Sequence, residues 1–299
     1  MLARITYIIF ILFQKLLFIL PRKLRYYLAN GLGVILFYLI AKRRKIAIDN
    51  IQSHLGYSKS EARSLTKEVF KDVAFKLTEI MTLTAWGEKE FKARIEADNL
   101  DKLRKLYNQQ QPVILFTGHL GNWELLGVYL AYLGYPMNAI AKEQNNEYIY
   151  QQILKIRTSQ GGNVYTKKEI KQIYKSLLNN EFMLILGDQN KRSGVFIDFL
   201  DDAAATAKGP VYLARKTGAA IVPVFLIKQS DNKYKLIVKD AVKVAKDSSK
   251  KERLETLQQL HDQLEAVVKK YPKQWLWLHR RWKTRPEATD DKKRLTIDN

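Results

Sequence analysis

The chain has 299 residues, of which 46% are hydrophobic and none is cysteine, and its formal net charge is +21. This length accommodates one large α/β domain with appended segments, and the lack of cysteine excludes disulfides, thiolate catalysis and cysteine-ligated metals. The excess of positive charge indicates an anionic partner, namely nucleic acid, an anionic membrane or an acidic protein. No H-E-x-x-H, Walker A or G-x-G-x-x-G pattern occurs, so the sequence predicts neither a metal nor a nucleotide cofactor.

The N-terminal segment combines basic residues with two apolar runs, at residues 5–20 and 27–40. Each run is shorter than the roughly 20 residues of a membrane span. Either the first run spans the membrane, with the side chains of Arg4 and Arg22 reaching the head groups, or both runs lie as helices at the membrane surface. Nucleic-acid binders seldom carry such runs, so we predict a membrane partner and no nucleic acid. The K-R-R-K cluster at 42–45 is typical of a cytoplasmic face. We therefore expect residues 1–41 to be a membrane anchor or interfacial helices, the alternative being core helices of a soluble protein.

Strands and helices alternate after the anchor. The region 46–86 is helical, and S-K-S-E at 58–61 predicts a capping box. Near-continuous apolar strands between helices predict a single α/β domain at 42–282, with a sheet covered on both faces, and residues 283–299 are expected to be a charged, disordered tail. The predicted strands are 113–116, 137–141, 164–165, 182–186, 220–227 and 233–238, and the predicted helices are 100–109, 123–133, 147–159, 170–178, 207–216 and 249–269.

The stretch V-I-L-F-T-G-H-L-G-N-W-E at 113–124 passes from a strand through a glycine-containing turn into a helix. On a continuous helix, His119 and Glu124 would be about 140° apart, so they meet only if His119 precedes the helix and Glu124 lies in its first turn. A neutral histidine is a general base near pH 7, and a carboxylate on its other nitrogen fixes the tautomer. We predict His119 as the base and Glu124 as its partner. A buried histidine beside a helix cap is the alternative.

Two further polar positions are candidates for the same site. Asp188 and Gln189 follow the apolar strand 182–186, and ligands of α/β sheets bind at the carboxyl ends of strands. His119 and Asp188 could therefore face one crevice, although Asp188 could also simply begin a turn. Arg157 is either a solvated residue on a helix or a residue whose guanidinium binds Asp188, a phosphate or a thioester oxyanion.

The C-terminal aromatic segment, residues 275–282, could be either a core strand or an interfacial belt that touches lipid head groups. Trp275 and Trp277 are predicted to pack in the core, whereas Trp282 could lie either there or at lipid head groups. His54 and His261 are predicted on the surfaces of helices, and the helix 249–269 is expected to present a solvated, charged face.

Several motifs occur together in an order that is typical of one family. They are H-L-G-N-W-E at 119–124, Arg157 before the glycine pair 161–162, D-Q at 188–189, G-x-F at 194–196, Thr206 with Gly209, V-P at 222–223 and Q-W-L-W-L-H-R-R-W-K-T-R-P at 274–286. Over nearly its whole length the chain resembles the bacterial lipid A biosynthesis acyltransferases. The resemblance implies a glycerol-phosphate acyltransferase-like fold and an enzyme of the bacterial inner membrane, with its catalytic domain on the cytoplasmic side. It also implies catalytic roles for His119 and Glu124 and makes Arg157 and Asp188 a further active-site pair. Asn122 and Gln189 match motif positions whose roles the resemblance does not specify, and we predict that Asn122, Arg157, Asp188 and Gln189 bind substrate.

The resemblance further implies transfer of an acyl chain from acyl carrier protein, or CoA, to a hydroxyl of a lipid A precursor. Acyl carrier protein is acidic, which suits a basic surface. Relatives acylate mannosides, ornithine lipids, lysophospholipids and other membrane lipids, so the acceptor stays open, as do the chain length and the oligomeric state. A membrane-attached lipid esterase and a non-catalytic binding protein are rival interpretations.

Overall fold

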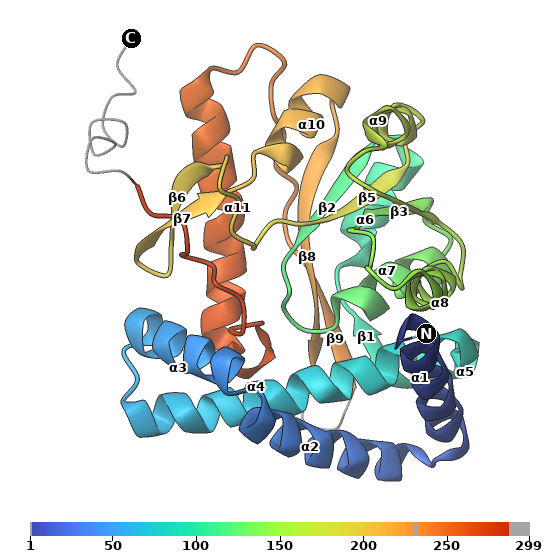
Figure 1. Cartoon of the computed structure of the whole chain (residues 1–299). Coiled ribbons are helices and arrows are strands. Elements are labelled where there is room, and N and C mark those ends of the chain that lie inside the picture. The colour runs from blue at the N-terminus through green and yellow to red at the C-terminus, as the bar shows by residue number, and fades with distance from the viewer. Residues whose placement is uncertain (1, 230–232, 287–299) are drawn as a thin grey trace.

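The computed structural model describes residues 2–229 and 233–286, and a seven-stranded sheet runs through its centre (Figure 1). The strand order is β1-β9-β8-β2-β5-β3-β4, and each neighbouring pair is parallel except β8 with β9. β6 and β7 form a separate antiparallel hairpin. The strands are β1 Ile95–Ala97, β2 Val113–Thr117, β3 Met137–Ile140, β4 Asn163–Tyr165, β5 Phe182–Leu186, β6 Val195–Phe199, β7 Asp202–Thr206, β8 Ala220–Lys228 and β9 Tyr234–Val238.

Both faces of the sheet are covered, as the apolar character of its strands requires. Along β2, Val113 and Leu115 belong to a core shared with α5, α6 and α7, whereas Ile114 and Phe116 belong to one shared with α9, α10 and α11. The prediction of a single α/β domain is confirmed. The helices around the sheet are α5 Glu88–Arg94, α6 Leu100–Asn108, α7 Trp123–Tyr132, α8 Glu147–Arg157, α9 Ile170–Leu178, α10 Gly209–Thr217 and α11 Lys250–Lys270, with short 3-10 turns at Leu83–Ala85 and Pro272–Gln274.

Four N-terminal helices cover one end of the sheet (Figure 1). Helix α4 crosses beneath the strands, and α2 lies along it on the outer side. The predicted capping box at the start of α4 is confirmed by reciprocal hydrogen bonds between Ser58 and Glu61. Because α2 packs along α4, one face of α2 is covered by protein rather than by lipid. The four helices are α1 Leu2–Ile19, α2 Arg22–Leu39, α3 Ala41–Leu55 and α4 Lys59–Ile80.

Helices α2 and α4 approach so closely that one position of α2 must be glycine. A Cβ added to Gly33 would lie 2.4 Å from the Cα of Lys71, whereas a Cβ on Gly31 would meet nothing within 4 Å. We therefore expect Gly33→Ala to lower the free energy of unfolding by about 1–3 kcal/mol through overpacking. The matched variant Gly31→Ala should raise it by about 0.5–1 kcal/mol, because alanine favours helices. Thermal unfolding of both variants in detergent measures the difference, and equal melting temperatures would contradict this close contact.

Helix α1 presents most of its apolar side chains to the outside. Among the described residues it is the one helix long and apolar enough to cross a membrane, and α2 with α3, which meet at a 92° bend, would add a second span if counted together. Hydrogen bonds at both ends attach α1 to the domain: for example, Gln14 donates to the carbonyl oxygen of Met81 at 2.7 Å, and Asn146, at the start of α8, donates to that of Ala3 at 2.9 Å. Membrane attachment of residues 1–41 stays a prediction.

The beginning of the predicted C-terminal tail is hydrogen-bonded to the domain. Thr284 donates its backbone N–H to the Asn190 side chain at 3.2 Å, and the Asn190 amide donates to the Thr284 hydroxyl at 3.1 Å. Residues 287–299 of that tail lie outside the described residues, so the boundaries proposed at 41, 42 and 282 remain predictions.

Candidate active site

The turn between β2 and α7 places His119 before the helix and Glu124 in its first turn, as the spacing predicts. Gly121 has φ +59°, and a Cβ there would lie 2.1 Å from the carbonyl oxygen of Leu226, so only glycine fits. The next residue, Asn122, caps α7 by accepting the backbone N–H of Leu125 at 3.1 Å. Together these two residues fix where the helix starts.

The carboxylate that binds His119 is Asp188. Nδ1 of His119 lies 2.8 Å from Oδ1 of Asp188, and the backbone N–H of His119 donates to Oδ2 at 2.6 Å. The parallel register explains this contact, because Thr117 of β2 is paired with Leu186 of β5 and each functional residue follows two positions later. The predicted crevice shared by His119 and Asp188 is therefore present, but the expectation that Glu124 is the partner of the imidazole is wrong.

Asp188 is held in its ionised form. It is 3% exposed, and the indole Nε1 of Trp275 also donates to Oδ2, at 2.8 Å. Burial by itself would raise the pKa of Asp188, but the charge of His119 and the hydrogen bonds from His119 and Trp275 outweigh burial and hold the pKa well below its ordinary value. An ionised Asp188 accepts the Nδ1–H of His119 and so leaves the Nε2 lone pair directed away from it.

Glu124 has a different partner, the guanidinium of Arg157 at the end of α8. Nε donates to one carboxylate oxygen at 2.8 Å and Nη2 donates to the other at 2.6 Å, a bidentate geometry that also fixes the plane of the carboxylate. Burial would lower the pKa of Arg157, but the hydrogen bond and charge of Glu124 raise it above its ordinary value. Of the roles that the sequence left open for Arg157, holding Asp188 is excluded by this contact.

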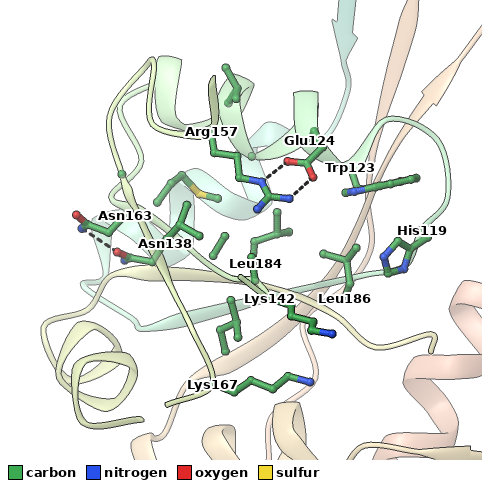
Figure 2. Close-up of a pocket in the computed structure, with 18 of the residues that line it drawn as sticks. His119, Trp123, Glu124, Asn138, Lys142, Arg157, Asn163, Lys167, Leu184 and Leu186 are labelled. Atoms are coloured by element: carbon green, nitrogen blue, oxygen red, sulfur yellow. Dashed lines mark hydrogen bonds and ion pairs between the residues drawn. The ribbon is translucent and has the colours of Figure 1, made fainter. Parts of the chain in front are cut away.

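The His119–Asp188 and Glu124–Arg157 pairs meet at one cavity of about 370 Å³ (Figure 2). His119, Glu124 and Arg157 line it, and so does Gln189, whose amide nitrogen lies 3.2 Å from Nε2 of His119. The remaining lining is largely apolar, with Trp123 beside the imidazole at 4.9 Å between ring centroids. The cavity therefore combines an imidazole, a fixed carboxylate and an apolar wall formed by Val128, Met137, Ala139, Ile140, Val164, Leu184 and Leu186.

Two of the predicted substrate-binding residues lie behind this cavity. Asn122 is fully buried, and its amide nitrogen faces Glu79 and Tyr234, so it positions α7 and does not line the cavity. Asp188 likewise lies behind His119. The sequence interpretation missed the bond from Trp275, which was predicted only as a core residue. It also missed Lys142 and Lys167, which line the cavity just beyond β3 and β4, although the strand-end rule could have found them.

Comparison with known proteins identifies the family of the chain. A family model described as bacterial lipid A biosynthesis acyltransferase matches residues 1–284. The chain belongs to that family. It is similar to the lipid A biosynthesis lauroyltransferase of Escherichia coli K12, with 26% identity over 276 residues that cover 90% of this chain and 88% of the relative.

Two other acyltransferases resemble the chain to a similar degree. The lipid A biosynthesis palmitoleoyltransferase of Escherichia coli K12 is 23% identical over 89% of this chain and 87% of its own length. A phosphatidylinositol mannoside acyltransferase of Mycolicibacterium smegmatis is 25% identical over 68% of this chain and 67% of its own length. Because the relatives share this activity class, the protein is an acyltransferase enzyme.

His261 occupies a position that the sequence interpretation placed wrongly. It is fully buried rather than on the surface of α11, and its ring nitrogens face the carbonyl oxygens of Leu257 at 2.8 Å and Gly187 at 3.2 Å. It therefore supports the residue that precedes Asp188. His54 is half-buried and stacks on Trp282, which is itself buried, so Trp282 packs in the core like Trp275 and Trp277.

Acid should destabilise the fold of this lipid A acyltransferase family member through His261. Burial, and to a lesser extent the charge of Arg281, lowers the pKa of His261 from 6.5 to about 4. Between pH 6.5 and 4, His261 is protonated in the unfolded chain but stays neutral in the folded chain. The free energy of unfolding therefore falls as the pH falls through this range. This residue should contribute a loss of about 2 kcal/mol between pH 7 and pH 5. Chemical denaturation at both pH values should show that loss reduced in His261→Gln, and an unchanged pH dependence would contradict the assignment.

Proposed function

We propose that this acyltransferase moves a fatty acyl chain from a thioester donor, acyl carrier protein or CoA, to a hydroxyl of a lipid A precursor or related glycolipid at a membrane. The observation that carries the proposal is the imidazole of His119, which Asp188 holds on one side while its Nε2 faces an apolar-walled cavity. Family membership supports the acyl chemistry and the class of acceptor.

In the proposed reaction His119 is first a base and then an acid. Nε2 accepts the proton of the acceptor hydroxyl as its oxygen attacks the thioester carbonyl carbon, and Asp188 stabilises the imidazolium that forms. The tetrahedral intermediate then collapses, the carbon–sulfur bond breaks, and the Nε2 proton goes to the thiolate. Gln189 donates towards Nε2, so the acceptor hydroxyl must displace that contact. The apolar wall suits the acyl chain, and Arg157 orients Glu124 at the edge of the cavity.

The N-terminal helices support attachment to a membrane. The outer face of α1 exposes several large apolar residues, and basic residues follow α2 at 42–45. Basic residues near an apolar helix favour the cytoplasmic leaflet, which agrees with a catalytic domain on the cytoplasmic side of a bacterial inner membrane. The net charge of +21 suits an acidic carrier protein as donor.

Mass spectrometry of lipids provides the test. The purified protein in detergent is incubated with acyl carrier protein thioester or acyl-CoA and a lipid A precursor, and we expect an acceptor mass raised by one acyl group. Release of free fatty acid without an acylated lipid would instead indicate an esterase, and binding of lipid with neither product would indicate a non-catalytic protein.

A second candidate acceptor follows from the comparisons. The similarity to phosphatidylinositol mannoside acyltransferases supports a glycosylated phospholipid in place of a lipid A precursor. The same assay with mannosides, lysophospholipids and ornithine lipids as parallel acceptors decides between them. The acceptor with the highest kcat/KM is the assigned one.

A further inference from the structure

Two lysines occupy equivalent positions beside the catalytic histidine. Ile140 of β3 is paired with Tyr165 of β4, and the ladder continues with the N–H of Ala141 donating to the carbonyl oxygen of Tyr165 at 2.9 Å. Lys142 and Lys167 each follow two residues after that pair, and both line the cavity. In Figure 2 both side chains extend on the side opposite Glu124 and Arg157, and their ammonium ends are directed towards the side where His119 lies.

These two ammonium groups are the uncompensated charges of the cavity. Arg157 is paired with Glu124 and His119 with Asp188, whereas neither Lys142 nor Lys167 makes a side-chain hydrogen bond or ion pair with any described residue. The adjacent Lys168 differs, because it binds Glu143 at 3.3 Å and does not line the cavity. Because both positively charged groups border the same cavity, an anion bound there would be attracted by both of them.

We propose that Lys142 and Lys167 bind a phosphate group of a substrate at the mouth of the active-site cavity. This inference rests on the proposed function. A phosphate carries up to two negative charges and accepts hydrogen bonds from both ammonium groups at once, which a single carboxylate matches less well. With the phosphate held by β3 and β4 and the base held by β2, only a hydroxyl or thioester at one distance from that phosphate reaches Nε2 of His119.

The phosphate has two chemical sources. One is the acceptor, if it is a phosphorylated glycolipid, and the other is the phosphopantetheine arm of the thioester donor. Kinetic measurements with phosphate-free counterparts separate them: a dephosphorylated glycolipid replaces the acceptor, and an acyl N-acetylcysteamine thioester replaces the donor.

The experiment compares Lys142→Gln, Lys167→Gln and the double variant with Lys168→Gln as the matched control. The double variant should raise KM for the phosphate-bearing substrate about 10- to 100-fold with kcat largely kept, because two charge-assisted hydrogen bonds are lost. For the phosphate-free counterpart of that same substrate, KM should be equal in the double variant and the wild type. Lys168→Gln should behave as wild type with every substrate. Equal KM values of wild type and double variant for all phosphate-bearing substrates would overturn the proposal.

A binding measurement tests the phosphate site independently of the proposed acyl transfer. Calorimetric titration of the full chain in detergent uses two unreactive probes, 4′-phosphopantetheine and the phosphorylated glycolipid without donor. Weaker binding of either probe to the double variant supports the lysine pair even if no acyl transfer is found with any donor. Unchanged affinity for both probes overturns it even if transfer is robust.

Discussion

Replacing Asp188 by asparagine is expected to lower kcat of acyl transfer by about 10²–10⁴-fold, nearly as much as His119→Ala. The amide has almost the same shape as the carboxylate, so the fold should persist. It nevertheless removes the charge that stabilises the imidazolium, and it can present an N–H to Nδ1, which would move the imidazole proton to Nε2 where the base is needed. The measurement is single-turnover transfer with a thioester donor and a fixed acceptor.

A double variant shows whether the two residues act as one unit. His119→Ala combined with Asp188→Asn should be no slower than His119→Ala alone, because Asp188 acts through the imidazole. Trp275→Phe is the control, since it removes one hydrogen bond to Oδ2 of Asp188 and keeps the charge; its effect should be much smaller. Near wild-type transfer by Asp188→Asn would show that the carboxylate does not orient the base.

The error in the partner of His119 shows what local spacing can and cannot reveal. The glycines and the apolar strand correctly predict a strand–turn–helix with His119 before Glu124. Which carboxylate reaches the imidazole depends on the register of β2 with β5, two strands that are distant in the chain. It also depends on the ion pair that Arg157 of α8 forms with Glu124. Such contacts are set by tertiary packing, which a window of a dozen residues does not contain.

The β6–β7 hairpin was missed for a different reason. Its second strand reads D-A-A-A-T, and alanine favours helices, so no strand signal is present. Its turn uses positive φ at Leu200 and Asp201, neither of which is glycine or asparagine. By contrast, burial of His261 could have been predicted, because it lies on the same helical stripe as Leu257 and Leu264, which are buried.

Variants of the Glu124–Arg157 ion pair distinguish its contribution to stability from its contribution to catalysis. Arg157→Met alone should lower the free energy of unfolding by about 2–3 kcal/mol, because it leaves the largely buried Glu124 carboxylate without its partner. It should also lower kcat/KM by about 10²–10³-fold if the guanidinium contributes to the charge of the transition state. Thermal unfolding and transfer kinetics of the same preparations give both quantities.

The double variant Glu124→Leu with Arg157→Met decides which role dominates. An apolar pair of similar volume carries no buried charge, so most of the lost stability should return. Activity should stay low, because the cavity then has neither the Glu124 carboxylate nor the guanidinium. One nitrogen of that guanidinium, Nη1, is buried without a hydrogen-bond partner among the described residues. If activity returned with stability, the pair would only hold α8 against α7, and the charge that stabilises the intermediate would have to come from the turn at residues 118–122 instead.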